Sequence, residues 1–260
     1  MLLRVRSRLQ RLLADTPVEP LARSALRAYR KLVPRAASAM ERKTVEYDRM
    51  TAEVAARSLS SGGVCVDAGA NKGDLLRMFM AAAPQATFIA FEPIPELAKR
   101  LARQFPGASI RALALSDTTG EAEFRHFPDR QALSSLVVRP ERETGAAVET
   151  ITVQVGTLDD AVPERPVRFV KVDVEGVELA LLRGARRILR EERPVVVLEC
   201  GGEDNLIAVH DELESSGYAV WTMAGWLQAG EQLRGPAGVL AAADAGEWQF
   251  VAAPVGPPPG

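Results

Sequence analysis

The sequence predicts an α/β fold, a doubly wound and mostly parallel sheet with helices on both faces. Three observations lead to this prediction. Short apolar runs alternate with segments of helical composition through residues 44–253. A strand, a glycine-containing turn and a helix follow one another between residues 64 and 83. Acidic residues come directly after several apolar runs, where open parallel sheets bind their ligands.

The composition is that of a folded globular protein. The chain has 260 residues, 47% of them hydrophobic and 25% charged, and a net charge of -2. This length allows one domain with a large core, and the charge gives no sign of nucleic-acid binding. Cys65 and Cys200 lie in or beside apolar runs, which indicates buried thiols in a reducing compartment. With no apolar run of roughly eighteen residues and no signal-peptide pattern, we expect a cytoplasmic protein.

The first 43 residues differ from the rest of the chain. They hold eleven Lys or Arg against three Asp or Glu, and leucines recur there at helical spacing between arginines. One interpretation is a basic amphipathic helix on the inner face of a membrane, and the other is a helix that packs on the domain or on a second subunit. We therefore divide the chain into a basic helical extension (1–43), a main domain (44–253) and a disordered Pro/Gly tail (254–260).

The most informative stretch runs from Val64 to Gly73, where a short apolar run leads into a glycine turn. Gly69 and Gly73 can adopt conformations closed to other residues and let a ligand lie against the main chain beside the helix amides. Their G-x-x-x-G spacing is not the dinucleotide fingerprint G-x-G-x-x-G. Asp67 would sit badly beside a pyrophosphate but suits a ligand with ammonium and sulfonium charges, such as S-adenosylmethionine. An ordinary strand-to-helix turn is the alternative.

Glu92 follows the second predicted strand, residues 87–91, and precedes a helix predicted over residues 96–104. It lies about twenty residues beyond the glycine turn, where open α/β sheets place an acid against ribose hydroxyls. A third strand is predicted over residues 109–115. The turn after it contains Asp117, which either accepts a hydrogen bond from an adenine amino group or caps the turn. Runs at 122–127, 133–138 and 150–155 predict an antiparallel excursion or a flap.

Three further acids crowd the end of the strand predicted over residues 167–172. Asp173 and Glu175 alternate with apolar residues, and Glu178 falls in the first turn of the next helix. A fifth strand over residues 194–198 delivers Glu199. A helix over residues 206–216 and strands over 218–222 and 248–252 complete the alternation.

These motifs resemble the FkbM family of S-adenosylmethionine-dependent methyltransferases, which mostly methylate hydroxyls of sugars and natural products. The resemblance rests on Val66-Asp-Ala-Gly-Ala-Asn-Lys-Gly, Phe91-Glu-Pro, Ala114-Leu-Ser-Asp, Lys171-Val-Asp-Val-Glu-Gly-Val-Glu and Leu198-Glu-Cys. It runs from about residue 45 to about residue 223. It implies the Rossmann-like class I methyltransferase fold, a seven-stranded sheet whose last strand is antiparallel.

The resemblance also implies the cofactor contacts. Asp67, Gly69, Asn71 and Gly73 would surround the methionine part of S-adenosylmethionine. Glu92 would hold the ribose, and Asp117 would hold the adenine.

Methyl transfer to a hydroxyl needs an aligned acceptor and a base. We expect Asp173 to be that base, with Glu175 and Glu199 orienting the acceptor. His126 is a weaker candidate because it lies in the uncertain excursion, and His210 is expected to be a packing or surface residue. A second explanation of the carboxylates is a Mg²⁺ ion that grips two acceptor hydroxyls.

The predicted activity is thus O-methylation of a sugar, glycolipid or natural product. The alternative is a non-catalytic domain that binds S-adenosylmethionine or assists glycolipid assembly, and a dehydrogenase is disfavoured by the glycine spacing. Expected partners are a small-molecule, glycan or glycolipid acceptor. The basic extension adds possible membrane contact or a homodimer, and the acceptor's identity stays open.

Overall fold

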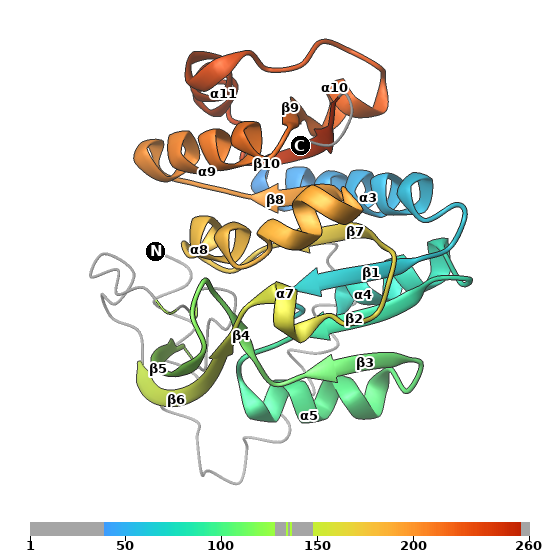
Figure 1. Ribbon diagram of the computed structural model, residues 1–260, viewed down its shortest axis with the longest axis vertical. Coiled ribbons are helices and arrows are strands. Elements are labelled where there is room, and N and C mark those ends of the chain that lie inside the picture. Colours follow the sequence, from blue (N-terminus) through green and yellow to red (C-terminus); the bar gives the residue numbers. More distant parts are fainter. Residues whose placement is uncertain (1–38, 128–133, 135, 137–147, 256–260) are drawn as a thin grey trace, which may run out of the picture. The chain divides into compact units, whose positions relative to one another are not determined.

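The computed structural model describes residues 39–127, 134, 136 and 148–255 (Figure 1). The chain divides into two compact units, residues 1–45 and 46–260, and the following description concerns the second. Most of the basic extension and the end of the tail lie outside the described residues, so membrane contact, dimerisation and disorder there remain predictions. Among the described helices, none is long and apolar enough to cross a bilayer.

A seven-stranded sheet forms the centre of this unit (Figure 1). Its spatial order is β3-β2-β1-β7-β8-β10-β9. The strands are β1 Val64–Ala68, β2 Thr87–Phe91, β3 Ala108–Arg111, β7 Val167–Val172, β8 Val195–Glu199, β9 Tyr218–Thr222 and β10 Gln249–Pro254. The pairs from β3 to β8 are parallel, whereas β10 runs antiparallel to both of its neighbours. The predicted seven-stranded sheet with an antiparallel last strand is confirmed.

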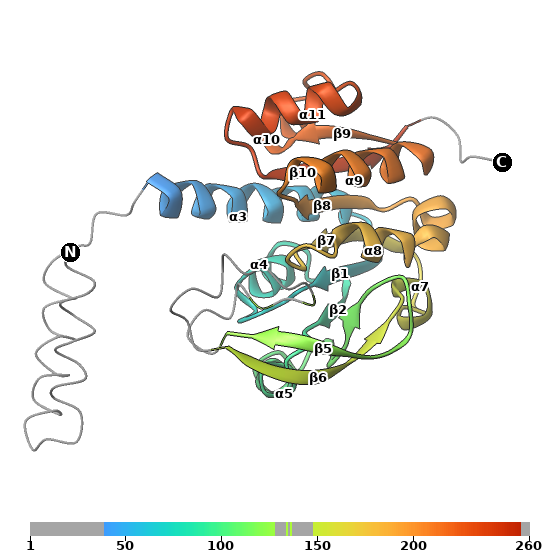
Figure 2. The same cartoon turned by 90° about the vertical axis from the view of Figure 1, so that its left-hand side faces the viewer.

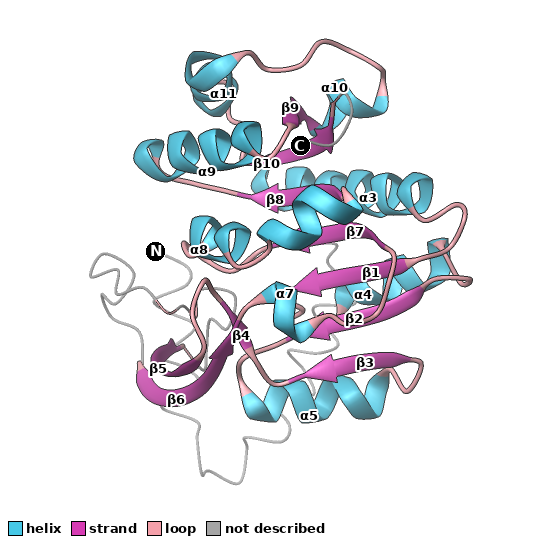
Figure 3. Ribbon diagram, in the orientation of Figure 1, coloured by secondary structure: helices cyan, strands magenta, loops and turns pink. Residues whose placement is uncertain are grey.

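Helices cover both faces of the sheet, as Figure 3 shows. One face packs against α3 Ala39–Ser58, α4 Asp74–Ala82, α5 Pro95–Gln104 and α10 Met223–Leu227. The other packs against α7 Leu158–Ala161, α8 Glu178–Arg183, a π-helical turn Ile188–Glu192, α9 Glu203–Ser215 and α11 Gly235–Asp244. Because side chains alternate along a strand, β1 sends Cys65 and Asp67 to the first face and Val66 to the second.

A second, three-stranded sheet corresponds to the predicted excursion. β5 Gly120–His126 pairs antiparallel with β6 Glu149–Gly156, and β6 also pairs with β4 Ala114–Leu115. Figure 2 shows the curved β5–β6 pair beside the main sheet. Most of the predicted run 133–138 lies outside the described residues.

One strand prediction is wrong. Residues 109–115 do not form one strand, because the chain turns sharply after Arg111, where the Leu113 amide donates to the Arg111 carbonyl. Residues 108–111 stay in the main sheet as β3, and residues 114–115 enter the second sheet as β4.

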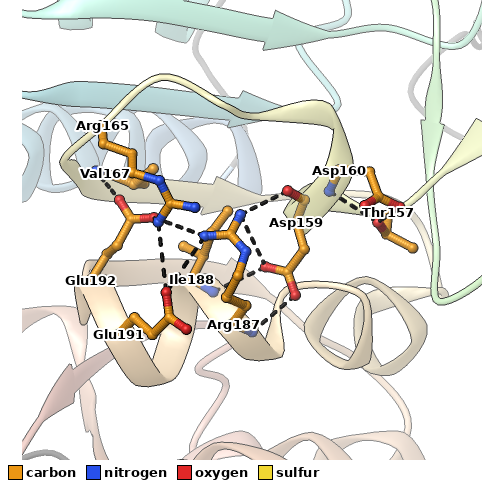
Figure 4. Close-up of polar contacts among 9 residues, drawn as sticks. All are labelled: Thr157, Asp159, Asp160, Arg165, Val167, Arg187, Ile188, Glu191 and Glu192. Atoms are coloured by element: carbon orange, nitrogen blue, oxygen red, sulfur yellow. Dashed lines mark hydrogen bonds and ion pairs between the residues drawn. The ribbon is translucent and has the colours of Figure 1, made fainter.

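An ion-pair network joins α7 and the π-helical turn to the amino end of β7 (Figure 4). Glu192 pairs with both Arg165 and Arg187 and accepts a hydrogen bond from the Val167 amide at 2.7 Å. The Asp159 carboxylate accepts hydrogen bonds from the backbone amides of Arg187 and Ile188, each at 2.9 Å. We call Asp159, Arg165, Arg187, Glu191 and Glu192 the amino-edge network. It fixes the start of β7 with charges of both signs.

Candidate functional site

The glycine turn after β1 is shaped by close packing. Gly69 has a φ of +82°, and a Cβ there would lie 1.9 Å from the carbonyl oxygen of Asp173. Gly73 has a φ of +80°, and its Cβ would lie 2.4 Å from the ring of Phe105. Any side chain at Gly69 would therefore separate the ends of β1 and β7. Contacts within the protein already explain both glycines.

Glu92 ties the glycine turn to the end of β2. Its Oε2 accepts a hydrogen bond from the backbone amide of Asn71, and its Oε1 accepts one from the backbone amide of Ile94, both at 2.9 Å. The Glu92 side chain is buried, and burial raises its pKa to about 7 although both amides and Lys171 oppose the shift. Each carboxylate oxygen keeps a second lone pair for a ligand hydroxyl. The Asn71 amide oxygen is buried with no hydrogen-bond partner among the described residues.

A buried lysine, Lys171, is the main feature that sequence reasoning missed. Its Nζ donates to the Gly69 carbonyl at 2.9 Å and lies 3.3 Å from Asp67 Oδ1 and 3.2 Å from Asp173 Oδ2. Lys171 is the register partner of Asp67 on β1 and lies two residues before Asp173. All three side chains therefore reach the same face of the sheet. The alternation in Lys171-Val-Asp173 was a usable signal.

Two carboxylates share this one ammonium group, so the cluster carries excess negative charge. Burial raises the pKa of Asp67, whose side chain is fully buried, and Lys171 only partly opposes this. Burial alone would lower the pKa of Lys171, but Asp173 and Asp67 outweigh it and raise the pKa. Asp67 Oδ2 has no hydrogen-bond partner in the described part of the chain. The site thus favours an additional positive charge.

Glu199, at the end of β8, lies at the same end of the parallel strands as Asp173. We call this end of the sheet the carboxyl edge. Burial raises its pKa to about 7, with further contributions from Asp173 and Glu175. Its Oε2 accepts a 3.1 Å hydrogen bond from Gln249 Nε2, which favours the ionised form. A carboxyl group of this kind changes protonation state near neutral pH, as a general base must.

The loop after β7 brings Glu175 to this edge in an unusual conformation. Glu175 has a φ of +53°, a left-handed conformation that costs energy for a residue with a side chain. Glu178 holds the loop, since its Oε1 accepts the Gly176 amide at 2.6 Å and its Oε2 accepts Asn205 Nδ2 at 2.8 Å. Glu178 therefore has a structural role.

Asp48 on α3 is a second residue that the sequence analysis missed. It is half-buried, and its pKa is raised by burial and by Asp74 and Asp173, against an opposing contribution from Lys171. These electrostatic contributions place it near the carboxyl edge. Asp48 stands in a helix of mostly charged and apolar residues, where nothing in the pattern distinguishes it.

The remaining candidates have contacts with other residues. Asp117 is exposed, and its Oδ1 accepts the Ser116 hydroxyl at 3.3 Å. His126 on β5 lies 3.5 Å from Glu149. In the described residues, the group whose ligand atoms could converge on a metal is His210, Asp211 and Glu214 on α9, and Asp173, Glu175 and Glu199 do not form one.

Comparison with known proteins gives a consistent result. The model of the methyltransferase FkbM domain matches residues 67–220. A protein named Methyltransferase sdnD, from Sordaria araneosa, is 32% identical over 162 residues, which is 49% of this chain and 62% of that protein. Methyltransferase 1 of Beauveria bassiana is 28% identical over 182 residues, 60% of this chain and 72% of that protein. The chain thus spans less than two thirds of the first relative's length.

Among solved structures, methyltransferase FkbM from Methylobacillus flagellatus is similar with a TM-score of 0.45 and 15% identity. The match covers 74% of this chain and 43% of that one.

Proposed function

The chain belongs to the FkbM methyltransferase family, and we propose that it transfers a methyl group to a hydroxyl oxygen of a small molecule. The cofactor of this family is S-adenosylmethionine, which supplies a methyl group activated by its sulfonium. We infer the acceptor oxygen from the residues at the carboxyl edge of the sheet. A sugar, a glycolipid or another natural product would present such a hydroxyl.

The residues present fit this cofactor. S-adenosylmethionine carries an ammonium and a sulfonium group and no phosphate, and the edge holds Asp67 and Asp173 against Lys171. Asp67 Oδ2 and Asn71 Oδ1 are buried acceptors without partners in the described residues. We propose that they bind the amino-acid part of the cofactor beside the glycine turn. Glu92 would accept the ribose hydroxyls, and Asp117 would contact the adenine.

The base is best assigned to Glu199. Asp173, the first expectation from sequence, has its Oδ2 within 3.2 Å of Lys171 Nζ, so taking up a proton would weaken this ion pair. Glu199 has a pKa of about 7, so both of its protonation states are populated near neutral pH. Asp173 Oδ1 and Glu175 would then orient the acceptor hydroxyl. The convergence of Asp67, Asp173 and Lys171 at the glycine turn, with Glu199 ending the neighbouring strand β8, is the observation that carries the proposal.

Binding of S-adenosylhomocysteine is the first test. We expect micromolar binding by isothermal titration calorimetry, similar in Mg²⁺ and in EDTA, and no binding of NAD. The bound protein is then screened against hydroxylated acceptors with a labelled methyl donor. Absence of binding in both conditions would overturn the assignment of the glycine turn.

Glu199→Gln separates an enzyme from a binding domain. The variant keeps the shape of the side chain and loses its basicity, so we expect turnover to fall by roughly 10²- to 10⁴-fold while S-adenosylhomocysteine binds as before. If transfer proceeds at the wild-type rate, Glu199 is not the base. If no acceptor is methylated by the wild type although the cofactor product binds, the non-catalytic alternative is favoured.

A further inference from the structure

The start of β10 is held by α3, through three consecutive residues. Tyr47 donates its hydroxyl hydrogen bond to Glu247, and its ring packs edge-on against Trp248 with centroids 4.7 Å apart. Thr51 Oγ1 donates to Gln249 Oε1 at 3.3 Å. Tyr47 and Thr51 lie one turn apart on α3, and each is only 1% exposed. We call these contacts the α3–β10 clamp.

Gln249, which is held by Thr51, in turn contacts Glu199. The two residues are direct register partners on β10 and β8, and Gln249 Nε2 donates to Glu199 Oε2 at 3.1 Å. A glutamine amide has one acceptor and one donor group. With its oxygen bonded to Thr51, its NH₂ group faces Glu199. The hydrogen-bonded chain Thr51–Gln249–Glu199 therefore holds the Glu199 carboxyl group beside the Gln249 NH₂ group.

We propose that Gln249, oriented by the α3–β10 clamp, is a positioning residue that holds the Glu199 carboxyl group and stabilises its ionised form. This inference rests on the proposed role of Glu199 as the base. Thr51 and Gln249 lie outside the segment 67–220 that matches the family model. The family match contains Glu199 and does not contain the residues that orient it.

The charges around Glu199 show why one donor matters. Asp173 and Glu175 disfavour its ionised form, and Lys171 and Gln249 favour it. From α3, Thr51 contacts Gln249, Tyr47 contacts Glu247, and Asp48 adds a carboxyl group near Asp173 and Lys171. Without Gln249, only Lys171 would oppose the rise in the Glu199 pKa that burial and the neighbouring acids cause.

The test is a titration of the glutamate carboxyl carbons by ¹³C NMR in the full chain, without cofactor. Glu199→Gln identifies the Glu199 resonance by its loss. Because a hydrogen bond to the charged form is removed, we expect Gln249→Met to move the Glu199 midpoint upward by about one pH unit. Thr51→Val, which keeps the side-chain shape, should move it in the same direction by less. An unchanged midpoint in both folded variants would overturn the inference.

Gln85→Met is the matched control. It makes the same exchange at a glutamine that donates to the Leu59 carbonyl at 2.7 Å, and it should leave the Glu199 midpoint unchanged. If Gln249→Met does not fold, Thr51→Val decides the question alone, since a wild-type midpoint there contradicts the clamp.

The pH–rate profile keeps this inference apart from the proposed function. If Glu199 is the base, the rising limb of the rate moves with the NMR midpoint in Gln249→Met. A midpoint that moves while the rate limb stays fixed supports the positioning by Gln249 and overturns the assignment of Glu199 as the base.

Discussion

The acidic side chains at the two ends of the parallel strands have different surroundings. We call these ends of the central sheet the amino edge and the carboxyl edge. At the amino edge, Glu192 meets two arginines and a backbone amide, and Asp159 meets two amides and Arg187. At the carboxyl edge, one lysine serves both Asp67 and Asp173. Each of these two amino-edge acids thus meets several donors, whereas at the carboxyl edge Asp67 Oδ2 has no hydrogen-bond partner among the described residues and the pKa values of Glu92 and Glu199 are raised.

This difference separates charges that hold the fold from charges kept for a ligand. A buried acid that meets its full set of donors costs the folded protein little. An acid that lacks such partners raises the free energy of the unliganded protein, and a cationic ligand relieves that cost. The buried acceptors without partners at the carboxyl edge are therefore a physical signature of a binding site.

Removal of Lys171 should show the largest effect. Lys171→Met leaves Asp67 and Asp173 facing each other without a cation, so we expect the free energy of unfolding to fall by about 3 kcal/mol at pH 8. The loss should be smaller at pH 5.5, where protonation relieves the repulsion. Urea unfolding at both pH values measures it.

Lys99→Met is the control for that exchange, because Lys99 makes an exposed 3.1 Å pair with Glu96 and should change stability by at most about 0.5 kcal/mol. Equal losses in the two variants would contradict the comparison of the two edges.

Breaking the amino-edge network should affect stability alone. Glu192→Gln removes the charge that Arg165 and Arg187 share, and since both arginines are partly exposed we expect a loss of about 2 kcal/mol. Binding of S-adenosylhomocysteine should stay unchanged at a temperature where the variant is folded. Glu191→Gln, at a largely exposed side chain with ion-pair distances of 3.8 and 3.9 Å, should change neither quantity. Weaker cofactor binding in Glu192→Gln would show that the two edges are not independent.

The smallest effect is a gain in stability. The pKa of Glu199 rises from 4.5 to about 7 on folding, so the native state holds a proton there that the unfolded chain has lost. Its contribution to stability is full below about pH 4.5 and disappears as the pH rises through 7. The glutamine in Glu199→Gln carries no charge. We therefore expect the free energy of unfolding at pH 8 to be about 1 kcal/mol higher than in the wild type, allowing for partial solvent exposure. At pH 4.5 the difference should vanish, and thermal or urea unfolding at both values decides.

Local sequence patterns were enough to locate most of the sheet. Residues 87–91 and 218–222 form strands with the predicted bounds, since β-branched and aromatic residues between turn signals define them. The sequence predicts Asp173 and Glu199 at strand ends and Asp67 just before the glycine turn, and the structure brings the three acids to one edge. Their catalytic and cofactor roles stay predictions.

Features that depend on contacts between distant residues were not predicted. The ion pairs of Lys171 need the register of β1 against β7, and the bond from Gln249 to Glu199 needs β10 beside β8. Helix α11 begins with Gly235 and Pro236, and although a proline suits the first turn of a helix, Gly238 within the helix disfavours it. It forms because Val239 and Ala242 are buried in the core, and tertiary packing outweighs the local preference.

The clamp that orients Glu199 joins residues far apart in the order of synthesis. Thr51 precedes Gln249 by 198 positions, and Gln249 follows Glu199 by 50. A growing chain therefore exposes α3 and completes β8 well before β10 has left the ribosome. Until β10 inserts antiparallel between β8 and β9, the Glu199 carboxyl group has no amide to meet. Maturation of the carboxyl edge is thus one of the last events in the biogenesis of this fold.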